Sequence, residues 1–418
     1  MKVAVLGAGV IGVTTAYFLA RDGHQVTVID AETDAAMGTS FANGGQISPS
    51  ESVPWGNSDT IGRIVRWTLT PDAPFRLRLK YDRHQWKWLL KFAANCNQQS
   101  FVTNAGHMVA LAAHSRAVLN RLQTELDLAF DGEQRGILRV YKSLKTRDEA
   151  AEIIPLMTSH GVEMRALSAA ECLALEPALG PALDAGTITG GLYAPDDQSG
   201  DAHKFSRAIA EAAAAAGAEF QFGRNVLRLE IENDHIAGII TDHGRVGVDA
   251  AIVCLGTGTA PLLRHVGLDI PIYPVKGYST TVPVGQTNLA PRVSITDESR
   301  RIVVSRLGDR IRAAGKADIV GYQTHLAPRR ARSVYHGLQK LFPQIASDDE
   351  PEFWTGLRPV TPDAMPIMGP TEIRHLFVNS GHGTLGWTMA AGSAHLMADV
   401  IAGRKTPIPT APYAPGRF

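Results

Sequence analysis

Three side chains in the sequence have the chemistry to hold or polarise a small polar ligand. Arg358 stands between apolar Leu357 and Pro359, where a guanidinium fork suits either a carboxylate ligand or a structural ion pair. Tyr278, in a predicted strand, could donate its hydroxyl to a ligand or pack with that hydroxyl satisfied. His382 has the pKa range of a general base, but we favour a role in shaping the turn around it. All three are candidate catalytic residues.

A glycine-rich turn near the start of the chain predicts a dinucleotide site. An apolar run at 3–6 predicts a strand, a helical pattern continues to residue 19, and the motif GxGxxG separates the two. Gly7 permits the tight turn, Gly9 lets the backbone approach a pyrophosphate, and Gly12 lets helix and strand pack closely. The phosphates would face the helix N-terminus, where free N–H groups favour anions.

An acidic residue follows the second predicted strand. Gln25–Ile29 has a strand pattern and Asp30 comes directly after it, 18 residues beyond Gly12. This is close to the spacing of about 20 residues at which an acid bonds an adenosine ribose. Because an acid there repels a 2′-phosphate, NADP is disfavoured.

A second glycine turn near the end of the chain distinguishes FAD from NAD. Leu376–Asn379 predicts a strand, three glycines follow within 380–386, and Trp387–Ile401 predicts a helix. The start of that helix could stabilise negative charge on a reduced flavin. One terminus would hold the pyrophosphate and the other the flavin ring, so FAD is the better interpretation. Ala250–Leu255, ending in a glycine turn, and Asn225–Leu229, which suits an adenine, fit the same domain.

Composition sets the limits of these hypotheses. The 418 residues exceed one usual core and predict two interleaved domains, while 41 basic and 41 acidic residues argue against a nucleic-acid partner. Three distant cysteines fit a reducing cytoplasm, and no HExxH or CxxC spacing supports a metal site. The predicted strand begins so near Met1 that we expect no signal peptide, and no apolar run is long enough to span a bilayer.

A basic, tryptophan-rich stretch lies at residues 55–92. It carries four of the six tryptophans, and eight basic but only two acidic residues fall between Ile61 and Phe92. Such a composition suits an anionic membrane surface. The alternative is a helical flap with inward tryptophans and solvated charges. We therefore expect a cytoplasmic protein, and peripheral contact with the inner membrane remains open.

The sequence resembles the D-amino acid dehydrogenase family, within the D-amino acid oxidase and glycine oxidase group. The matching stretches run from residue 3 to 403: VLGAGVIGVTTAYFLARDGHQVTVID, TSFANGGQISPSESVPW, YPVKGYS, FWTGLRPVTPDAMPIMG and NSGHGTLGWTMAAGSAHLMADVIAG. The resemblance implies FAD and oxidation of a D-amino acid such as D-alanine to an imino acid, which hydrolyses to a 2-oxo acid and ammonia. It also implies a quinone as electron acceptor, and Arg358 as the anchor of the substrate carboxylate.

The motifs and the resemblance together give a set of candidate cofactor-binding residues. They are Val3, Leu6, Gly7, Ala8, Gly9, Val10, Ile11, Gly12, Asp30, Thr39, Ser40, Asn43, Gly45, Gln46, Ile47, Val226, Gly256, Gly356, Gly381, Gly383, Thr384, Leu385, Gly386 and Thr388.

The expected fold is α/β, with a Rossmann-type FAD-binding domain of the glutathione-reductase kind. It is interleaved with an α+β substrate domain built on a mainly antiparallel sheet, for which the alternating patterns at 136–141 and 270–320 provide strands. We assign 1–48, 101–130, 195–258 and 355–410 to the FAD domain. The substrate domain takes 49–100, 131–194 and 259–354.

Three alternatives to a quinone-linked D-amino acid dehydrogenase stay open at this point. The first is a D-amino acid or glycine oxidase that uses oxygen, and the second a dehydrogenase of D-proline or hydroxyproline. The third is a flavin-binding interaction protein without catalysis.

Overall fold

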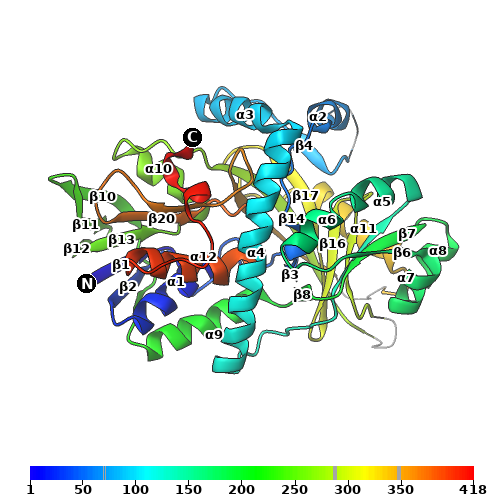
Figure 1. The fold of residues 1–418 in the computed structure, drawn as a ribbon, viewed down its shortest axis with the longest axis horizontal. Coiled ribbons are helices and arrows are strands. Elements are labelled where there is room, and N and C mark those ends of the chain that lie inside the picture. The colour runs from blue at the N-terminus through cyan, green and yellow to red at the C-terminus, as the bar shows by residue number, and fades with distance from the viewer. Residues whose placement is uncertain (69, 71, 286–289, 346–349) are drawn as a thin grey trace.

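The chain folds into two parts on either side of one long helix (Figure 1). The structure is a computed structural model that describes residues 1–418 except 69, 71, 286–289 and 346–349. The long helix is α4 (Gln98–Leu126). In the first part it packs on α12 (Gly386–Ile401), α12 packs on α1 (Val10–Arg21), and α1 packs on α9 (Ala202–Ala215).

The first part is built on a sheet whose order, within the described residues, is β19-β20-β13-β1-β2-β9. All neighbours pair in parallel except β19 and β20. The central strands are buried on both faces, as expected for parallel strands covered by helices. The bounds are β1 (Lys2–Leu6), β2 (Gln25–Ile29), β9 (Glu219–Gln221), β13 (Ala250–Val253), β19 (Ile367–Pro370) and β20 (Leu376–Ser380).

The predicted Rossmann-type arrangement is confirmed. An additional antiparallel sheet, β10-β11-β12, lies beside the first part. It contains β10 (Val226–Glu232), β11 (His235–Thr241) and β12 (Gly244–Gly247).

The second part contains the larger sheet, with the order β18-β14-β17-β16-β15-β5-β7-β6 in the described chain and β4 paired to β17. Most of its strand pairs are antiparallel, which confirms the mainly antiparallel sheet predicted from the sequence. The pairs β5–β15 and β4–β17 are parallel. Residues 286–289 of the predicted strand region lie outside the described residues. The bounds are β4 (Phe75–Leu77), β5 (Ile137–Tyr141), β6 (Arg165–Ser168), β7 (Gly190–Ala194), β14 (Tyr273–Pro283), β15 (Ser294–Asp297), β16 (Ile302–Leu307), β17 (Arg310–Ile319) and β18 (Glu352–Val360).

The two faces of this larger sheet have different neighbours. One face packs its apolar residues against α11 (Pro328–Leu341), α7 (Ala169–Leu175) and α8 (Gly180–Asp184). The other contacts the loop that follows β2, where a Cβ on Gly44 would meet Val303 of β16. The short pair β3 (Gln46–Ile47) and β8 (Gln198–Ser199) continues this contact between the two parts. This second face is the one turned toward the glycine turns.

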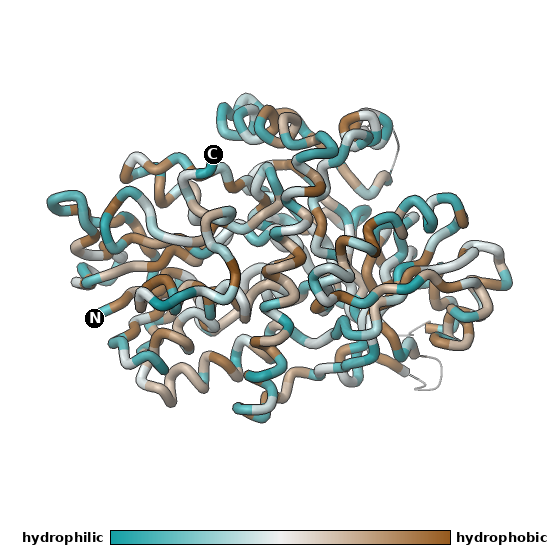
Figure 2. Tube along the Cα trace, viewed as in Figure 1, coloured by the Kyte–Doolittle hydropathy of each residue, from teal (hydrophilic) through white to brown (hydrophobic). Residues whose placement is uncertain are grey.

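A peripheral arm lies at the top of Figure 1. It consists of α2 (Thr60–Thr68), β4 and α3 (Arg83–Asn95). Figure 2 shows hydrophobic stretches in this arm as well as in the interior strands. The remaining helices are α5 (Leu144–Ala151), α6 (Ile154–Ser159) and α10 (Thr259–Arg264).

Candidate active site

The two glycine turns lie next to each other although nearly the whole chain separates them. Strand β13 pairs with β1 on one side and with β20 on the other, so their carboxyl ends share one edge of the sheet. The hydroxyl of Ser380 donates to the carbonyl of Gly256 at 3.2 Å, and the amide of Asn379 donates to Thr15 of α1 at 3.1 Å. The expected meeting of the two chain ends is therefore confirmed.

The first turn requires glycine for two different reasons. Gly7 has φ +104°, and a Cβ there would lie 2.7 Å from the carbonyl oxygen of Cys254. A Cβ on Gly12 would lie 1.8 Å from the carbonyl oxygen of Gly7, so a side chain would force helix and strand apart. At Gly9 the nearest atom is the hydroxyl of Ser40 at an ordinary 3.6 Å. Gly9 therefore leaves open space where the sequence expects a pyrophosphate.

Asp30 and Ser40 converge on this turn. Asp30 accepts hydrogen bonds from the backbone of Ala8 at 2.5 Å and of Glu32 at 2.8 Å. Ser40 accepts one from the backbone of Val10 at the start of α1, at 3.1 Å. Both side chains thus lie beside the helix N-terminus, where negative charge is favoured.

The loop after β2 runs from this turn to the larger sheet. Thr39 donates to the carbonyl of Leu357 at 2.8 Å, next to Arg358, and Asn43 accepts from the backbone of Gly45. The side chain of Gln46 points into the sheet, where its amide donates to Ser294 and Thr296. Ile47 is buried in the core of the first part. The loop therefore connects the two sites that the sequence singles out.

The second turn is joined to β18. Gly381 and Gly383 have φ +80° and +58°, and the backbone N–H of Gly383 donates to Pro359 at 2.9 Å. His382 pairs with Val360 through a backbone bridge. Helix α12 begins at Gly386 after Thr384 and Leu385, and Thr388 in its first turn accepts from the backbone of Ser48. The turn is thus held directly against the strand of Arg358.

His382 is buried and neutral. Its side chain is 3% exposed, and its Nε2 has no hydrogen-bond partner among the residues that the structure describes. Burial lowers the pKa of His382 to about 3. A group with such a pKa is a weak base at neutral pH, so the structure supports the turn-shaping role over the general base.

This burial predicts a pH dependence of stability. In the unfolded chain a histidine binds a proton below about pH 6.5, whereas His382 in the folded chain does so only near 3, so unfolding takes up a proton between these values. Stability must therefore fall as the pH falls through this window. We expect wild type to lose about 2 kcal/mol relative to His382→Gln between pH 7 and pH 5. Urea unfolding of both proteins measures this; a pH-independent difference would contradict it.

Arg358 lies on the sheet face that is turned toward the glycine turns. A Cβ on Gly277 of the neighbouring strand would fall 2.4 Å from the guanidinium carbon, so the missing side chain of Gly277 makes room for Arg358. The Nη1 group donates to the carbonyl of Lys316 at 2.7 Å. Burial lowers the pKa of Arg358 to about 10, so the group stays cationic at neutral pH.

Arg358 has no ion-pair partner in the described part of the chain. The nearby carboxylate of Asp318 is bonded to Tyr278 and to Arg330 instead. A partly buried cation with a free fork is the arrangement expected for an arginine that binds a carboxylate from outside.

Tyr278 lies on the opposite face of the same sheet, which corrects the expectation that it joins Arg358. Its ring belongs to the apolar cluster under α11, and its hydroxyl donates to Asp318 at 3.2 Å. Successive residues of a strand point to opposite faces, and Tyr278 directly follows Gly277, over which the guanidinium lies. The structure therefore separates Tyr278 from the other candidate residues.

Four other candidate cofactor-binding residues lie within strands. Val3 is at the opposite end of β1 from Leu6, and both are buried in the sheet. Val226 begins β10, outside the main sheet. Gly356 shares the face of Arg358, and a Cβ there would fall 2.1 Å from the ring of Trp354. Trp354 thus lies across Gly356.

Sequence reasoning did not select Trp354 or Ser279 as site residues. The ring of Trp354 is 6.4 Å from that of Phe41 in the loop after β2. Ser279 pairs with Trp354 across β14 and β18. Their two-residue spacing from Gly356 and Gly277 within predicted strands is the signal that could have placed them on this face.

The residues present fit an extended flavin nucleotide. Buried polar atoms are normally hydrogen-bonded, yet within the described part of the chain Nε2 of His382 and the hydroxyl of Ser279 have no partner. The open side of Gly9, Nε2 of His382 and the hydroxyl of Ser279 are together called the polar track below.

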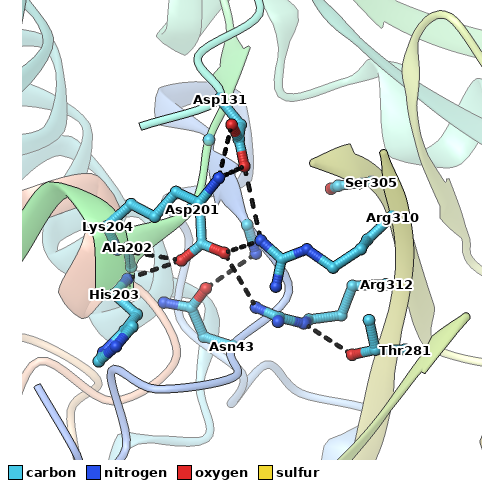
Figure 3. A network of polar contacts seen from close by, with 12 residues as sticks. Asn43, Asp131, Asp201, Ala202, His203, Lys204, Thr281, Ser305, Arg310 and Arg312 are labelled. Atoms are coloured by element: carbon cyan, nitrogen blue, oxygen red, sulfur yellow. Dashed lines mark hydrogen bonds and ion pairs between the residues drawn. The ribbon is translucent and has the colours of Figure 1, made fainter. Parts of the chain in front are cut away.

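A buried ionic network joins the two parts beside this track (Figure 3). Asp201 accepts from the backbone of His203 and Lys204 at the start of α9. Its other oxygen pairs with Arg310 at 2.9 Å and lies 3.9 Å from Arg312, both on β17. The network fixes the larger sheet relative to the nucleotide-binding part.

Removing the charge of Asp201 should destabilise the protein. Asn in its place can still cap α9, but Arg312, which is 4% exposed, loses its carboxylate and keeps, among the described residues, only Thr281 as a bonded partner. We expect Asp201→Asn to lower the free energy of unfolding by about 3 kcal/mol. Asp34→Asn is the matched control, because Asp34 pairs with the exposed Arg207 outside this network; an equal loss in both variants would contradict the argument.

Comparison with known proteins agrees with this geometry. Residues 2–400 match the family model described as FAD dependent oxidoreductase. A D-amino acid dehydrogenase of Paramagnetospirillum magneticum is 44% identical over 98% of this chain and 96% of its own length. Another, from Granulibacter bethesdensis, is 41% identical over the full length of both chains.

Solved structures share the fold. Glycine oxidase from Geobacillus kaustophilus superposes with a TM-score of 0.79 at 21% identity, over 100% of this chain and 99% of its own. L-proline dehydrogenase from P. horikoshii gives 0.76 at 19% identity, over 100% and 97%. The chain thus belongs to the FAD dependent oxidoreductase family and, within it, to the D-amino acid dehydrogenases.

Proposed function

We propose that the protein oxidises D-amino acids such as D-alanine and passes the electrons to a quinone-type acceptor. The observation that carries the substrate class is the cationic fork of Arg358, which lacks a carboxylate partner in the described chain. The names of the relatives favour D-amino acids.

In this proposal the chain's residues bind and orient the reactants. Arg358 holds the substrate carboxylate with two parallel hydrogen bonds, and the carbonyl of Lys316 fixes the guanidinium. Trp354 forms an apolar wall beside the substrate side chain, and Ser279 offers a hydroxyl to a polar atom. Tyr278 has no part in the reaction, because it faces the other side of the sheet.

The proposed cofactor site follows the polar track. Gly7, Gly9 and Gly12 cradle the pyrophosphate, Ser40 lies beside it, Asp30 bonds the adenosine ribose, and the 381–386 turn receives the flavin ring. FAD supplies the acceptor for the hydride that leaves Cα. The substrate would react with its amine neutral, the ammonium proton having passed to water, so loss of the hydride leaves a protonated imino acid, which water converts to a 2-oxo acid and ammonia. Because hydride transfer needs no protein nucleophile, positioning is the main contribution of the chain.

Anaerobic mixing with D-alanine tests the proposal. Flavin absorbance should bleach with D-alanine and recover on addition of a soluble quinone, while L-alanine leaves it unchanged. Bleaching only by glycine or a proline would redirect the substrate assignment. If the flavin absorbance recovers rapidly with oxygen but not with quinone, the protein is an oxidase. If no amino acid bleaches the flavin, the protein is a flavin-binding interaction protein without catalysis.

For the acceptor, we propose that the arm at 55–92 touches the cytoplasmic face of the inner membrane. The described residues contain no helix that is both long and apolar enough to cross a bilayer. Two tryptophans of the arm differ in exposure. Trp88 is buried and donates to the carbonyl of Val360, whereas Trp86 is 46% exposed. An exposed tryptophan among basic residues supports contact with an anionic surface.

A further inference from the structure

A recess of about 380 Å³ lies where α3 of the arm meets the end of α10. It adjoins the nucleotide-binding part but is separate from both glycine turns and from Arg358. Its lining residues come from α3 and from the turn after α10: Arg83, His84, Lys87, Arg264, Gly267, Leu268 and Asp269.

The recess is rich in positive charge. Lys87 is ion-paired with Asp269, the one acidic residue among those that line the recess. Arg83 and Arg264 have no carboxylate partner within ion-pair distance in the described part of the chain, and Arg83 bonds the ring of His84 at 3.3 Å. Burial, followed by Arg264 and Arg83, lowers the pKa of His84. Two guanidinium groups without a carboxylate partner in the described residues thus line the recess, although Arg264 also contacts the hydroxyl of Tyr322.

The recess opens beside the exposed face of α3. Arg83, Trp86, Lys87 and Leu90 follow one another at helical spacing, and all four are exposed. Leu90 is 71% exposed, an unusual position for a leucine beside an exposed tryptophan. Leu79 and Tyr81, just before the helix, are exposed as well. This face combines apolar side chains with the cations that line the recess.

The occupant that fits both features is an anionic phospholipid. Guanidinium forks match phosphate oxygens, and tryptophan and leucine prefer the boundary between headgroups and acyl chains. A free phosphate would use the arginines but would leave the apolar face uncovered. We propose that Arg83 and Arg264 bind a phospholipid phosphate while Trp86 and Leu90 enter the interface, an inference that rests on the membrane contact proposed above.

Docking in this way would orient the active site. Trp88, on the inner side of α3, donates to the carbonyl of Val360 at 2.8 Å, two residues beyond Arg358. Val360 is also bridged to His382 of the second glycine turn. The lipid-contacting helix and the substrate anchor therefore belong to one connected unit.

Co-sedimentation of the holoenzyme with vesicles tests the recess. The vesicles are phosphatidylcholine with and without phosphatidylglycerol, at low salt. Wild type should bind only the anionic vesicles. Arg264→Gln should weaken binding by more than tenfold. Arg78→Gln, an exposed arm arginine outside the recess, should lose only about fivefold, the effect of one surface cation.

Two further measurements make the outcome decisive. Arg207→Gln, on α9 at the bottom of Figure 1 and opposite the arm, should bind like wild type. D-Alanine oxidation with a soluble acceptor should be unchanged in every variant, which separates this inference from the catalytic proposal. If Arg264→Gln weakens vesicle binding no more than Arg78→Gln does, the recess does not bind the lipid phosphate, although the arm still contacts the membrane. If wild type does not bind anionic vesicles, both fall.

Discussion

Replacing Arg358 by methionine should raise the apparent KM for D-alanine from about 30-fold to several thousand-fold. This range corresponds to roughly 2–5 kcal/mol for the loss of one partner of a desolvated charge pair. The effect is expected mainly in KM, because the fork holds the carboxylate before and during hydride transfer. Steady-state kinetics with a soluble acceptor give both parameters, and FAD content must remain that of wild type.

Two variants show whether the fork itself is responsible. Gly277→Ala leaves Arg358 in the chain but places a Cβ 2.4 Å from its guanidinium carbon, so the side chain must move and KM should rise. Arg332→Met removes a distant exposed arginine and should change neither parameter. An unchanged KM in Arg358→Met would remove this residue from the substrate site.

Alanine at Gly9 should abolish FAD binding without unfolding the protein. The added Cβ meets nothing closer than 3.6 Å in the chain itself, and the φ of Gly9 is −69°, which alanine adopts freely. The methyl group instead occupies the space assigned to the pyrophosphate. The ratio of flavin to protein absorbance should fall to near zero, while thermal unfolding of the apoprotein stays as in wild type.

Alanine at Gly12 should fail in a different way. Its Cβ would lie 1.8 Å from a backbone oxygen, which cannot rotate away, so the strand and helix must separate. We expect FAD loss together with an apoprotein destabilised by about 3 kcal/mol or more. Gly62→Ala, where a Cβ meets open space, is the neutral control. Full FAD content in Gly9→Ala would contradict the proposed pyrophosphate position.

The sequence alone determined the nucleotide-binding half in detail. GxGxxG, the strand before it and Asp30 after the next strand are close in the chain, so local rules for turns, helices and spacing were enough. The strand Gln25–Ile29 and the helix that starts near Trp387 were placed to within one residue. The resemblance to D-amino acid dehydrogenases came from motifs of the same local kind.

Only the tertiary structure decided which side chains meet across the larger sheet. Tyr278 and Arg358 both lie in motifs that made them candidate site residues, but the alternation of β14 and β18 places them on opposite faces. The ion network of Asp201 with Arg310 and Arg312 spans more than 100 residues and has no local signature. Spacing along a chain fixes what is near in sequence, whereas pairing register and the packing of two sheets fix what faces a common ligand.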